Sequence, residues 1–199
     1  MSLRHALLSL LSSGPLTGYD ASRQFGASVG HVWRALDSQI YPELRRMLAD
    51  GLLVARSVPW GSKGATKTEY AVSDEGIAAL RAWQGEPLAY APTRHPARLK
   101  AAYFEWAGPG DARRQLEAHR EHYRQERDLA RQVIEEIRSG GQPTLQRRLA
   151  DATPSEAERI VRFKEFAHQG TVMQAEQEIA WAEAGLRMLE EMGDPACYE

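Results

Sequence analysis

The sequence predicts a mainly α-helical protein with two domains. Apolar residues recur at helical spacing through most of the 199 residues, and two short extended runs occur between residues 52 and 72. A proline-rich stretch at 85–96 separates short helical segments from long ones. We therefore expect an N-terminal domain at 1–84, a linker at 85–96 and an α-helical C-terminal domain at 97–199.

The composition is that of a protein from a reducing compartment. Hydrophobic residues make up 43% of the chain, and no apolar run reaches the roughly 18 residues of a membrane span. The N-terminus carries Arg4 and His5 without a signal-peptide cleavage pattern. Cys197 is the only cysteine, which excludes an internal disulfide and a cysteine-based zinc site. We expect a cytoplasmic protein without a membrane partner.

The formal net charge of −2 hides an asymmetry between the two halves. Residues 1–85 hold nine Lys and Arg against seven Asp and Glu, whereas residues 86–199 hold sixteen against twenty. The N-terminal part is therefore the better binder of a polyanion. The excess is small, however, and the pI of about 6.3 is well below the value above about 9 that is typical of strongly basic nucleic-acid domains. Charge alone does not establish DNA binding.

Two helices are predicted at the start of the chain. Leu3–Leu11 has apolar residues at helical spacing and ends at the Ser-Ser-Gly-Pro sequence of residues 12–15, so it reads as a core helix. Thr17 is a suitable N-cap for a second helix that begins at Gly18 and continues through Phe25.

A two-faced third helix is predicted between Leu36 and Gly51. Ser38 is its expected N-cap, since Pro42 has no backbone N–H to give an interior turn, and Gly51 is the expected left-handed C-cap. The residues expected in the core are Trp33, Leu36, Ile40, Leu44, Met47 and Leu48. The opposite face carries Ser38, Pro42, Arg45 and Ala49, flanked by Tyr41 and Arg46.

This polar face is short and cationic, and it admits two interpretations. It can present a hydroxyl, an amide, a phenol and two guanidinium groups to a DNA major groove about 12 Å wide. A solvated amphipathic helix without a ligand explains the segment, taken alone, at least as well.

A β-hairpin and a fourth helix complete the N-terminal domain. The extended runs Leu52–Val58 and Thr68–Val72 flank a Gly-rich, Lys-bearing segment, which predicts a hairpin with a basic tip. Ser73 is the expected N-cap of a helix over Asp74–Trp83. Three helices, a hairpin and a helix are the order of a winged helix-turn-helix domain.

The C-terminal domain is predicted to consist of helices that need a partner surface. A short helix is expected at Ala97–Ala107, a long one from an Asp111 cap to about Ser139, and a final one from about Ser155 to Met192. Helices of this length are stable only where their apolar stripes are buried. An antiparallel pair leaves part of each stripe open, so we expect a homodimer formed by the same surface on two chains.

Three sequence blocks in the N-terminal domain occur in the order of a known family. They are Gly-Pro-Leu-Thr-Gly-Tyr at 14–19, Tyr-Pro-Glu-Leu-Arg-Arg-Met at 41–47 and Glu-Tyr-Ala-Val-Ser-Asp-Glu-Gly at 69–76. Over these residues the chain resembles the PadR family of bacterial transcriptional regulators. The resemblance implies a DNA-binding repressor, usually dimeric, whose third helix reads the operator and whose wing touches phosphate. The longer members carry a helical dimerisation domain, to which the C-terminal half is similar in length and pattern.

Candidate DNA contacts follow from side-chain chemistry and from this resemblance. They are Tyr19, Ser38, Gln39, Tyr41, Arg45, Arg46, Lys63, Thr66 and Lys67. An arginine can bond guanine bidentately and a glutamine can pair with adenine, whereas Tyr19 at a helix N-terminus and the two lysines suit phosphate. Either arginine can instead be a phosphate clamp, and the sequence does not separate the two roles.

The resemblance also implies an effector, a small aromatic or phenolic molecule that releases the operator. The candidate effector-binding residues are Tyr103, Phe104, Trp106, His168, Met173 and Trp181. Aromatic residues at helical spacing more often belong to a core or an interface, and we favour that interpretation over a ligand site.

The sequence carries no enzyme motif. His119 and His122, with Glu126 one turn further on, could geometrically hold a metal, but a solvated helix face explains them better. There is no Gly-rich phosphate loop, GxSxG or HExxH, so we expect no catalytic residues, metal or cofactor. The alternative to a DNA-binding regulator is a helical interaction adaptor whose winged domain binds protein.

Overall fold

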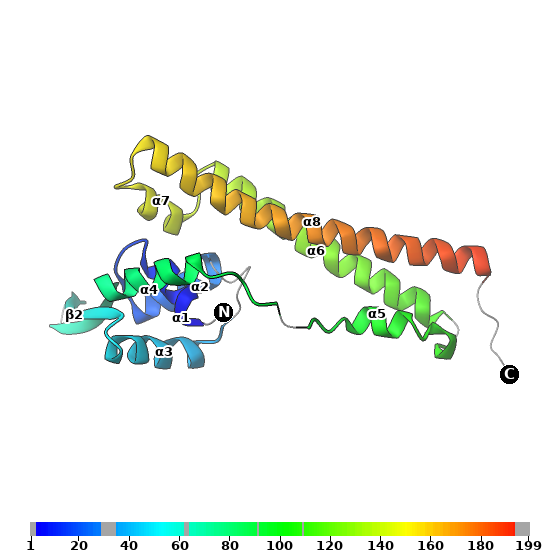
Figure 1. The fold of residues 1–199 in the computed structure, drawn as a ribbon, viewed down its shortest axis with the longest axis horizontal. Helices are drawn as coiled ribbons and strands as arrows, with labels where there is room; N and C mark the ends of the chain where they lie inside the picture. Colours follow the sequence, from blue (N-terminus) through cyan, green and yellow to red (C-terminus); the bar gives the residue numbers. More distant parts are fainter. Residues whose placement is uncertain (1–2, 29–34, 62–63, 91, 109, 194–199) are drawn as a thin grey trace. The chain divides into compact units, whose positions relative to one another are not determined.

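The computed structural model describes residues 3–28, 35–61, 64–90, 92–108 and 110–193 (Figure 1). The chain forms two compact units, one of Met1–Ala89 with Gly140–Ala157 and one of Tyr90–Ser139 with Glu158–Glu199. Among the described residues, no helix is long and apolar enough to cross a membrane.

The first unit is a winged helix-turn-helix with one additional helix. Its elements are α1 (Leu3–Leu11), β1 (Leu16–Thr17), α2 (Gly18–Ser28), α3 (Asp37–Ala49), β2 (Leu53–Trp60), β3 (Ala65–Val72), α4 (Asp74–Gly85) and α7 (Pro143–Leu149). The second unit contains α5 (Pro96–Ala101), the 3₁₀ turn η1 (Phe104–Trp106), α6 (Asp111–Arg138) and most of α8 (Pro154–Met192).

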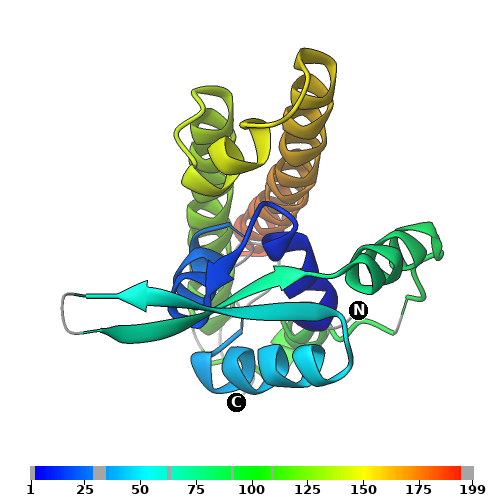
Figure 2. The same ribbon diagram turned by 90° about the vertical axis from the view of Figure 1, so that its left-hand side faces the viewer.

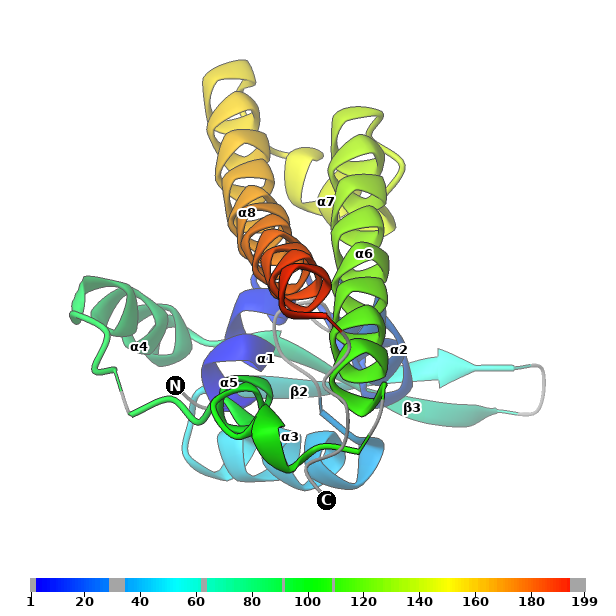
Figure 3. The same cartoon turned by 90° about the vertical axis from the view of Figure 1, so that its right-hand side faces the viewer.

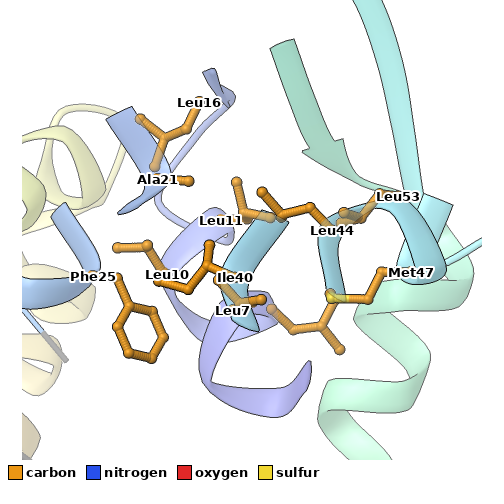
Figure 4. Close-up of a cluster of buried hydrophobic side chains, with 11 residues drawn as sticks. Leu7, Leu10, Leu11, Leu16, Ala21, Phe25, Ile40, Leu44, Met47 and Leu53 are labelled. Carbon is orange, nitrogen blue, oxygen red and sulfur yellow. The ribbon is translucent and has the colours of Figure 1, made fainter. Parts of the chain in front are cut away.

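A core of buried side chains joins α1, α2 and α3 to the sheet. Figure 4 shows leucines of α1 pointing toward Phe25 of α2 and toward Ile40, Leu44 and Met47 of α3. All of these residues are almost completely buried, as the helical spacing predicts. Burying one face of α3 in this way turns its other face outward.

The sheet has three antiparallel strands in the order β1-β3-β2. The hairpin of β2 and β3 is longer than predicted and projects from the domain as the wing (Figure 2). β1 was not predicted, because two residues carry no strand pattern. Leu16 of β1 pairs with Tyr70 of β3, so the strand depends on a partner distant in sequence.

The start of α3 differs from the prediction. The helix begins at Asp37 with Leu36 as N-cap, so the expectation that Ser38 is the cap is wrong. The side-chain carbonyl of Gln39 accepts a hydrogen bond from the Leu36 N–H at 3.0 Å and thereby satisfies the helix start.

The assignment of two leucines to the core is also wrong. Leu36 is 70% exposed and Leu48 is 36% exposed. Leu36 precedes the helix, so helical periodicity does not set its direction, and Leu48 lies at the edge of the buried stripe. Trp33, also expected in the core, lies outside the described residues.

The other predicted caps of the domain are confirmed. Gly51 has a φ of 75°, and the Leu52 N–H donates to the Met47 carbonyl at 2.9 Å, which closes α3 in a Schellman motif. The Ser73 hydroxyl accepts from the Gly76 N–H at 3.0 Å at the start of α4. Thr17 accepts from the Asp20 N–H at 3.2 Å at the start of α2.

Gly76 shows why the start of α4 needs a glycine. A Cβ on this residue would collide with the backbone carbonyl of Leu52 and would lie 2.7 Å from Val72 Cγ1. The first turn of α4 therefore packs directly against the backbone at the base of the wing. The Glu-Gly pair at the end of the third sequence block permits this close approach.

Several C-terminal elements depart from their predicted bounds. The short helix ends at Ala101 and a 3₁₀ turn follows it, whereas a single helix was expected to Ala107. Asp111 is the first residue of α6 and not its cap, which is Gly110 with a φ of 71°. α7 was not predicted, because Gly140-Gly141-Gln142-Pro143 reads only as a break, although proline also suits the first turn of a new helix.

In the second unit, α6 and α8 pack as an antiparallel pair. Figures 1 and 3 show them side by side along most of their length. Arginines at increasing positions of α6 pair with glutamates at decreasing positions of α8, in Arg113–Glu190, Arg124–Glu183 and Arg131–Glu176. At one end, a buried cluster of Ala112, Leu116, Leu186 and Leu189 joins the two helices.

Candidate nucleic-acid interface

The outward face of α3 carries five of the side chains expected to contact DNA. The candidates on α3 are Ser38, Gln39, Tyr41, Arg45 and Arg46, and all five are exposed. They share one surface because Ile40, Leu44 and Met47 anchor the opposite side of the helix in the core. The face thus presents hydrogen-bond donors and two positive charges on a rigid element.

The two arginines of this face differ in their partners. Arg46 Nη1 lies 3.0 Å from Glu43 Oε2 in an ion pair, so its guanidinium already has a partner. Glu43 is 8% exposed, and its other oxygen accepts from Arg4 Nε at 3.0 Å. Arg45 forms no ion pair or hydrogen bond with any residue that the structure describes. Its full set of donors is available to a ligand.

The network around Glu43 ties α1 to α3. Arg4 reaches Asp50 at 2.7 Å as well as Glu43. The hydrogen bond to Glu43, with further help from Asp50, raises the pKa of Arg4 despite partial burial. Sequence reasoning did not identify Arg4 or Glu43, because their positions are 39 residues apart and neither belongs to a local pattern.

Tyr41 lies against α2 because Gly18 leaves room for it. A Cβ on Gly18 would be 2.9 Å from Tyr41 Cε1. The glycine of the first sequence block and the tyrosine of the second therefore form one contact. It fixes the start of α2 against α3, and Tyr41 retains 36% exposure.

Tyr19 is the second residue of α2 and is 61% exposed. The guanidinium of Arg23 lies 5.9 Å from the centre of its ring. A phenol beside the N–H groups at a helix N-terminus is well placed to donate to a phosphate oxygen.

The wing places a lysine over an aromatic ring. Lys67 Nζ lies 4.7 Å from the centre of the Trp60 ring, and Trp60 is 54% exposed. Thr66 is exposed beside them, and Lys63 lies outside the described residues. Sequence reasoning missed Trp60, although its position in the segment before the basic tip was a usable signal. The contact limits the positions that the ammonium group can take.

The six candidate effector residues do not gather at one place. Phe104 and Trp181 line a cavity of about 350 Å³ within the second unit, together with Leu116, Lys100, His119 and His122. Tyr103, Trp106, His168 and Met173 do not line it. His168 is buried, whereas Tyr103, Trp106 and Met173 are more than half exposed.

One wall of this cavity is held by an ion network. Glu178 is 6% exposed and accepts from Arg98 Nη2 at 2.8 Å, and it bonds His119 Nε2 at 3.1 Å. Burial alone would raise the pKa of Glu178, but the hydrogen bonds from Arg98 and His119 outweigh it and lower the pKa. Burial, together with the charge of Glu178, raises the pKa of Tyr123 nearby.

The residues considered for a metal do not converge. His119 is engaged by Glu178, and His122 stacks edge-on against Tyr123 at 5.0 Å between ring centres. The described part of the chain holds no group of three His, Cys, Asp or Glu that could hold a metal ion.

Comparison with known proteins gives a family match over the N-terminal domain. Residues 7–82 match the model of the transcriptional regulator PadR-like family. The chain is 38% identical over 81 residues to the negative transcriptional regulator PadR of Bacillus subtilis (strain 168), which is 41% of this chain and 44% of the relative. It is 39% identical over 94 residues to the probable transcriptional regulator Rv1176c of Mycobacterium tuberculosis, which is 47% of this chain and 48% of the relative. The chain thus spans less than half the length of both relatives.

Solved structures share the fold over nearly the whole chain. B. subtilis PadR in complex with operator DNA has a TM-score of 0.73 at 23% identity, covering 94% of this chain and 98% of that one. The same protein in complex with p-coumaric acid has a TM-score of 0.70 at 22% identity, covering 94% and 95%. The Vibrio cholerae virulence activator AphA has a TM-score of 0.58 at 23% identity, covering 96% and 100%.

Proposed function

We propose that this chain is a PadR-like transcriptional regulator, a homodimeric repressor that binds an inverted-repeat operator. The family is one of regulators and not of enzymes. The observation that carries the proposal is the outward face of α3, on which Arg45 has no competing partner among the described residues. A relative of known structure, B. subtilis PadR, is complexed with operator DNA.

In this proposal each part of the interface has its own role. Arg45 reads a base edge, Arg46 and Tyr19 contact the sugar-phosphate backbone of the DNA, and Lys67 of the wing contacts a phosphate. Ser38, Gln39, Tyr41, Lys63 and Thr66 complete the contact surface. Repression follows most simply if the bound dimer blocks polymerase, which implies a cytoplasmic site of action.

The dimer is proposed to form through the C-terminal helices. Apolar residues of α8 that are about half or more exposed lie within about 100° of one another on an ideal helix. They are Phe163, Phe166, Met173, Met188 and Met192. A second copy of the same stripe would cover them, and the two-fold axis would match that of the operator, with half-sites about one or two helical turns apart.

The effector is proposed to be a small aromatic molecule bound in the cavity lined by Phe104 and Trp181. The relative from B. subtilis is complexed with p-coumaric acid, an aromatic acid. Binding beside Trp181 should quench tryptophan fluorescence, and Trp181→Phe is the matched control that removes this reporter. Unchanged fluorescence at millimolar phenolic acid would count against this cavity.

The test of the function is selection of bound fragments from sheared genomic DNA at about 150 mM salt, where specific contacts outcompete phosphate binding. Footprinting of the selected fragments should then reveal an inverted repeat. Arg45→Ala combined with Tyr41→Ala should abolish the footprint while the variant keeps its fold. Recovery of random sequence by the wild-type protein would reject operator recognition and leave the protein-binding alternative.

A further inference from the structure

α7 is a part of the first unit that lies, in sequence, between the two long helices of the second. Gly140–Ala157 clusters with the winged domain, whereas the flanking segments up to Ser139 and from Glu158 belong to the second unit. The chain therefore leaves the second unit, contacts the winged domain through α7 and returns. Such an excursion has a packing reason, since Leu145 of α7 is completely buried.

Two side chains of α7 bond the same residue of α2. Arg147 Nη2 donates to Gln24 Oε1 at 2.5 Å, and the Thr144 hydroxyl donates to the same oxygen at 3.3 Å. Arg147 Nη2 also lies 3.3 Å from the hydroxyl of Ser13, a buried residue in the turn after α1. These contacts join residues more than 100 positions apart in the sequence.

Arg147 is an unusual residue for a purely stabilising contact. Its Nε is buried without a hydrogen-bond partner, and among the described residues it has no carboxylate partner. Desolvating a guanidinium for two neutral acceptors gains little net stability. Such a group can instead fix the orientation of α7, because its planar donors fit only one arrangement of acceptors.

α2 in turn holds the recognition helix. The Ser22 hydroxyl of α2 donates to the carboxylate of Asp37 at the start of α3. Tyr41 of α3 packs against Gly18 of α2. An anchor on Gln24 is therefore linked through α2 to the face of α3 that carries Arg45. By contrast, residues 87–90 and 92–95, the other covalent route between the units, have no helix or strand.

We propose that Arg147 is a positioning residue that anchors α7 on Gln24 and so fixes the distance between the two winged domains of the dimer. The inference rests on the proposed function and deepens it, because it names what selects the operator's half-site spacing. Two winged domains on flexible linkers can bind half-sites at many spacings. Two winged domains held at a fixed distance bind half-sites at one spacing with full avidity.

The first experiment measures DNA spacing preference with full-length Arg147→Ala. The matched control is Arg148→Ala, which removes an exposed arginine from the next position of the same helix. The DNA probes are a single half-site, the selected inverted repeat, and the same repeat with its spacer changed by 5 bp, about half a helical turn. Both variants should bind the single half-site within about twofold of wild type.

The expected result is a loss of spacing preference in one variant only. Arg147→Ala should lower the preference for the selected spacing by about tenfold, as loss of part of the avidity implies, and Arg148→Ala should leave it unchanged. Arg147→Lys, which keeps a donor, should restore part of the preference. An unchanged spacing preference in Arg147→Ala would overturn the proposal. Gln24→Ala, which removes the acceptor instead, serves if Arg147→Ala does not fold.

A second measurement needs no DNA and separates the two proposals. Spin labels at Ser57→Cys in the wing and Gln174→Cys in α8, both exposed positions, are placed in a Cys197→Ser background. An excess of unlabelled protein restricts the measured distance to a single chain. A narrow distance distribution in wild type that broadens in Arg147→Ala supports the anchor even if no operator is found. An equally narrow distribution in the variant, or a broad one in wild type, rejects it.

Discussion

Glu43 and Arg46 form an ion pair on α3, with 3.0 Å between Oε2 and Nη1, while Arg45 has no such partner among the described residues. The two adjacent arginines of this face therefore differ in whether the guanidinium group is already paired. Arg46 is already paired with Glu43, whereas Arg45 keeps all of its donors available, which suits the base-reading role proposed for it.

Arg45→Ala should relax base preference at one operator position by about 1 to 3 kcal/mol. Arg46→Ala should instead weaken operator and random DNA alike, because an oriented guanidinium beside Glu43 suits a backbone contact. Binding competition with single-base operator variants measures both effects. Equal losses on operator and random DNA for Arg45→Ala would reject its base-reading role.

Lys67→Ala should weaken binding to all DNA sequences and reduce the salt slope by about 1, as expected for one phosphate contact. Trp60→Ala should reproduce part of this loss, because the indole ring lies 4.7 Å from the ammonium group and restricts it. Trp60→Phe keeps a ring and should lose less. Additive losses in the double variant would mean that Trp60 acts independently of Lys67.

Gly18→Ala should destabilise the protein by about 1 to 3 kcal/mol, because the added Cβ would lie 2.9 Å from Tyr41 Cε1. Gly26→Ala in the same helix is the matched control, since its Cβ would meet nothing within 4 Å and alanine is the better helix former. Urea unfolding measures both. In a Tyr41→Ala background the cost of Gly18→Ala should largely vanish, and a persistent cost would place the strain elsewhere.

The stability of the second unit should depend on Glu178 in acid. The pKa of Glu178 is lowered in the folded state from its ordinary value of 4.5. The carboxylate therefore contributes its full stabilisation at pH values above the ordinary pKa, and this stabilisation is lost as the pH falls through the lowered pKa. Glu178→Gln should remove this part of the acid dependence. Thermal unfolding of both proteins between about pH 3 and pH 7 measures it. Parallel curves across that range would show that Glu178 carries no such linkage.

Local features of the fold were predictable from the sequence. Gly51, Ser73 and Thr17 act where the sequence placed them, because a cap depends on hydrogen bonds within three or four residues. The buried face of α3 was predictable for Ile40 and Leu44 by helical period. Leu36 escaped the same rule because it lies one residue before the helix begins.

The candidate site was predictable in its residues but not in its contacts. The chemistry of the exposed face of α3 follows from the identities of its side chains. The pairing of Arg46 with Glu43 and the seating of Tyr41 on Gly18 depend on how α2 and α3 pack. Among the aromatic candidates, Phe104 and Trp181 line one cavity, because η1 and α8 bring them together.

By itself, the sequence determined the order of the main helices and the hairpin, the caps at Thr17, Gly51 and Ser73, and most of the buried stripe of α3, because these depend on interactions among near neighbours in the chain. The tertiary structure alone decided that β1 completes the sheet, that Glu178 bonds both Arg98 and His119, and that Arg147 reaches Gln24. The residues in these contacts lie between about 50 and 120 positions apart. No local preference specifies such pairs, since they form only when the packed core brings their elements together.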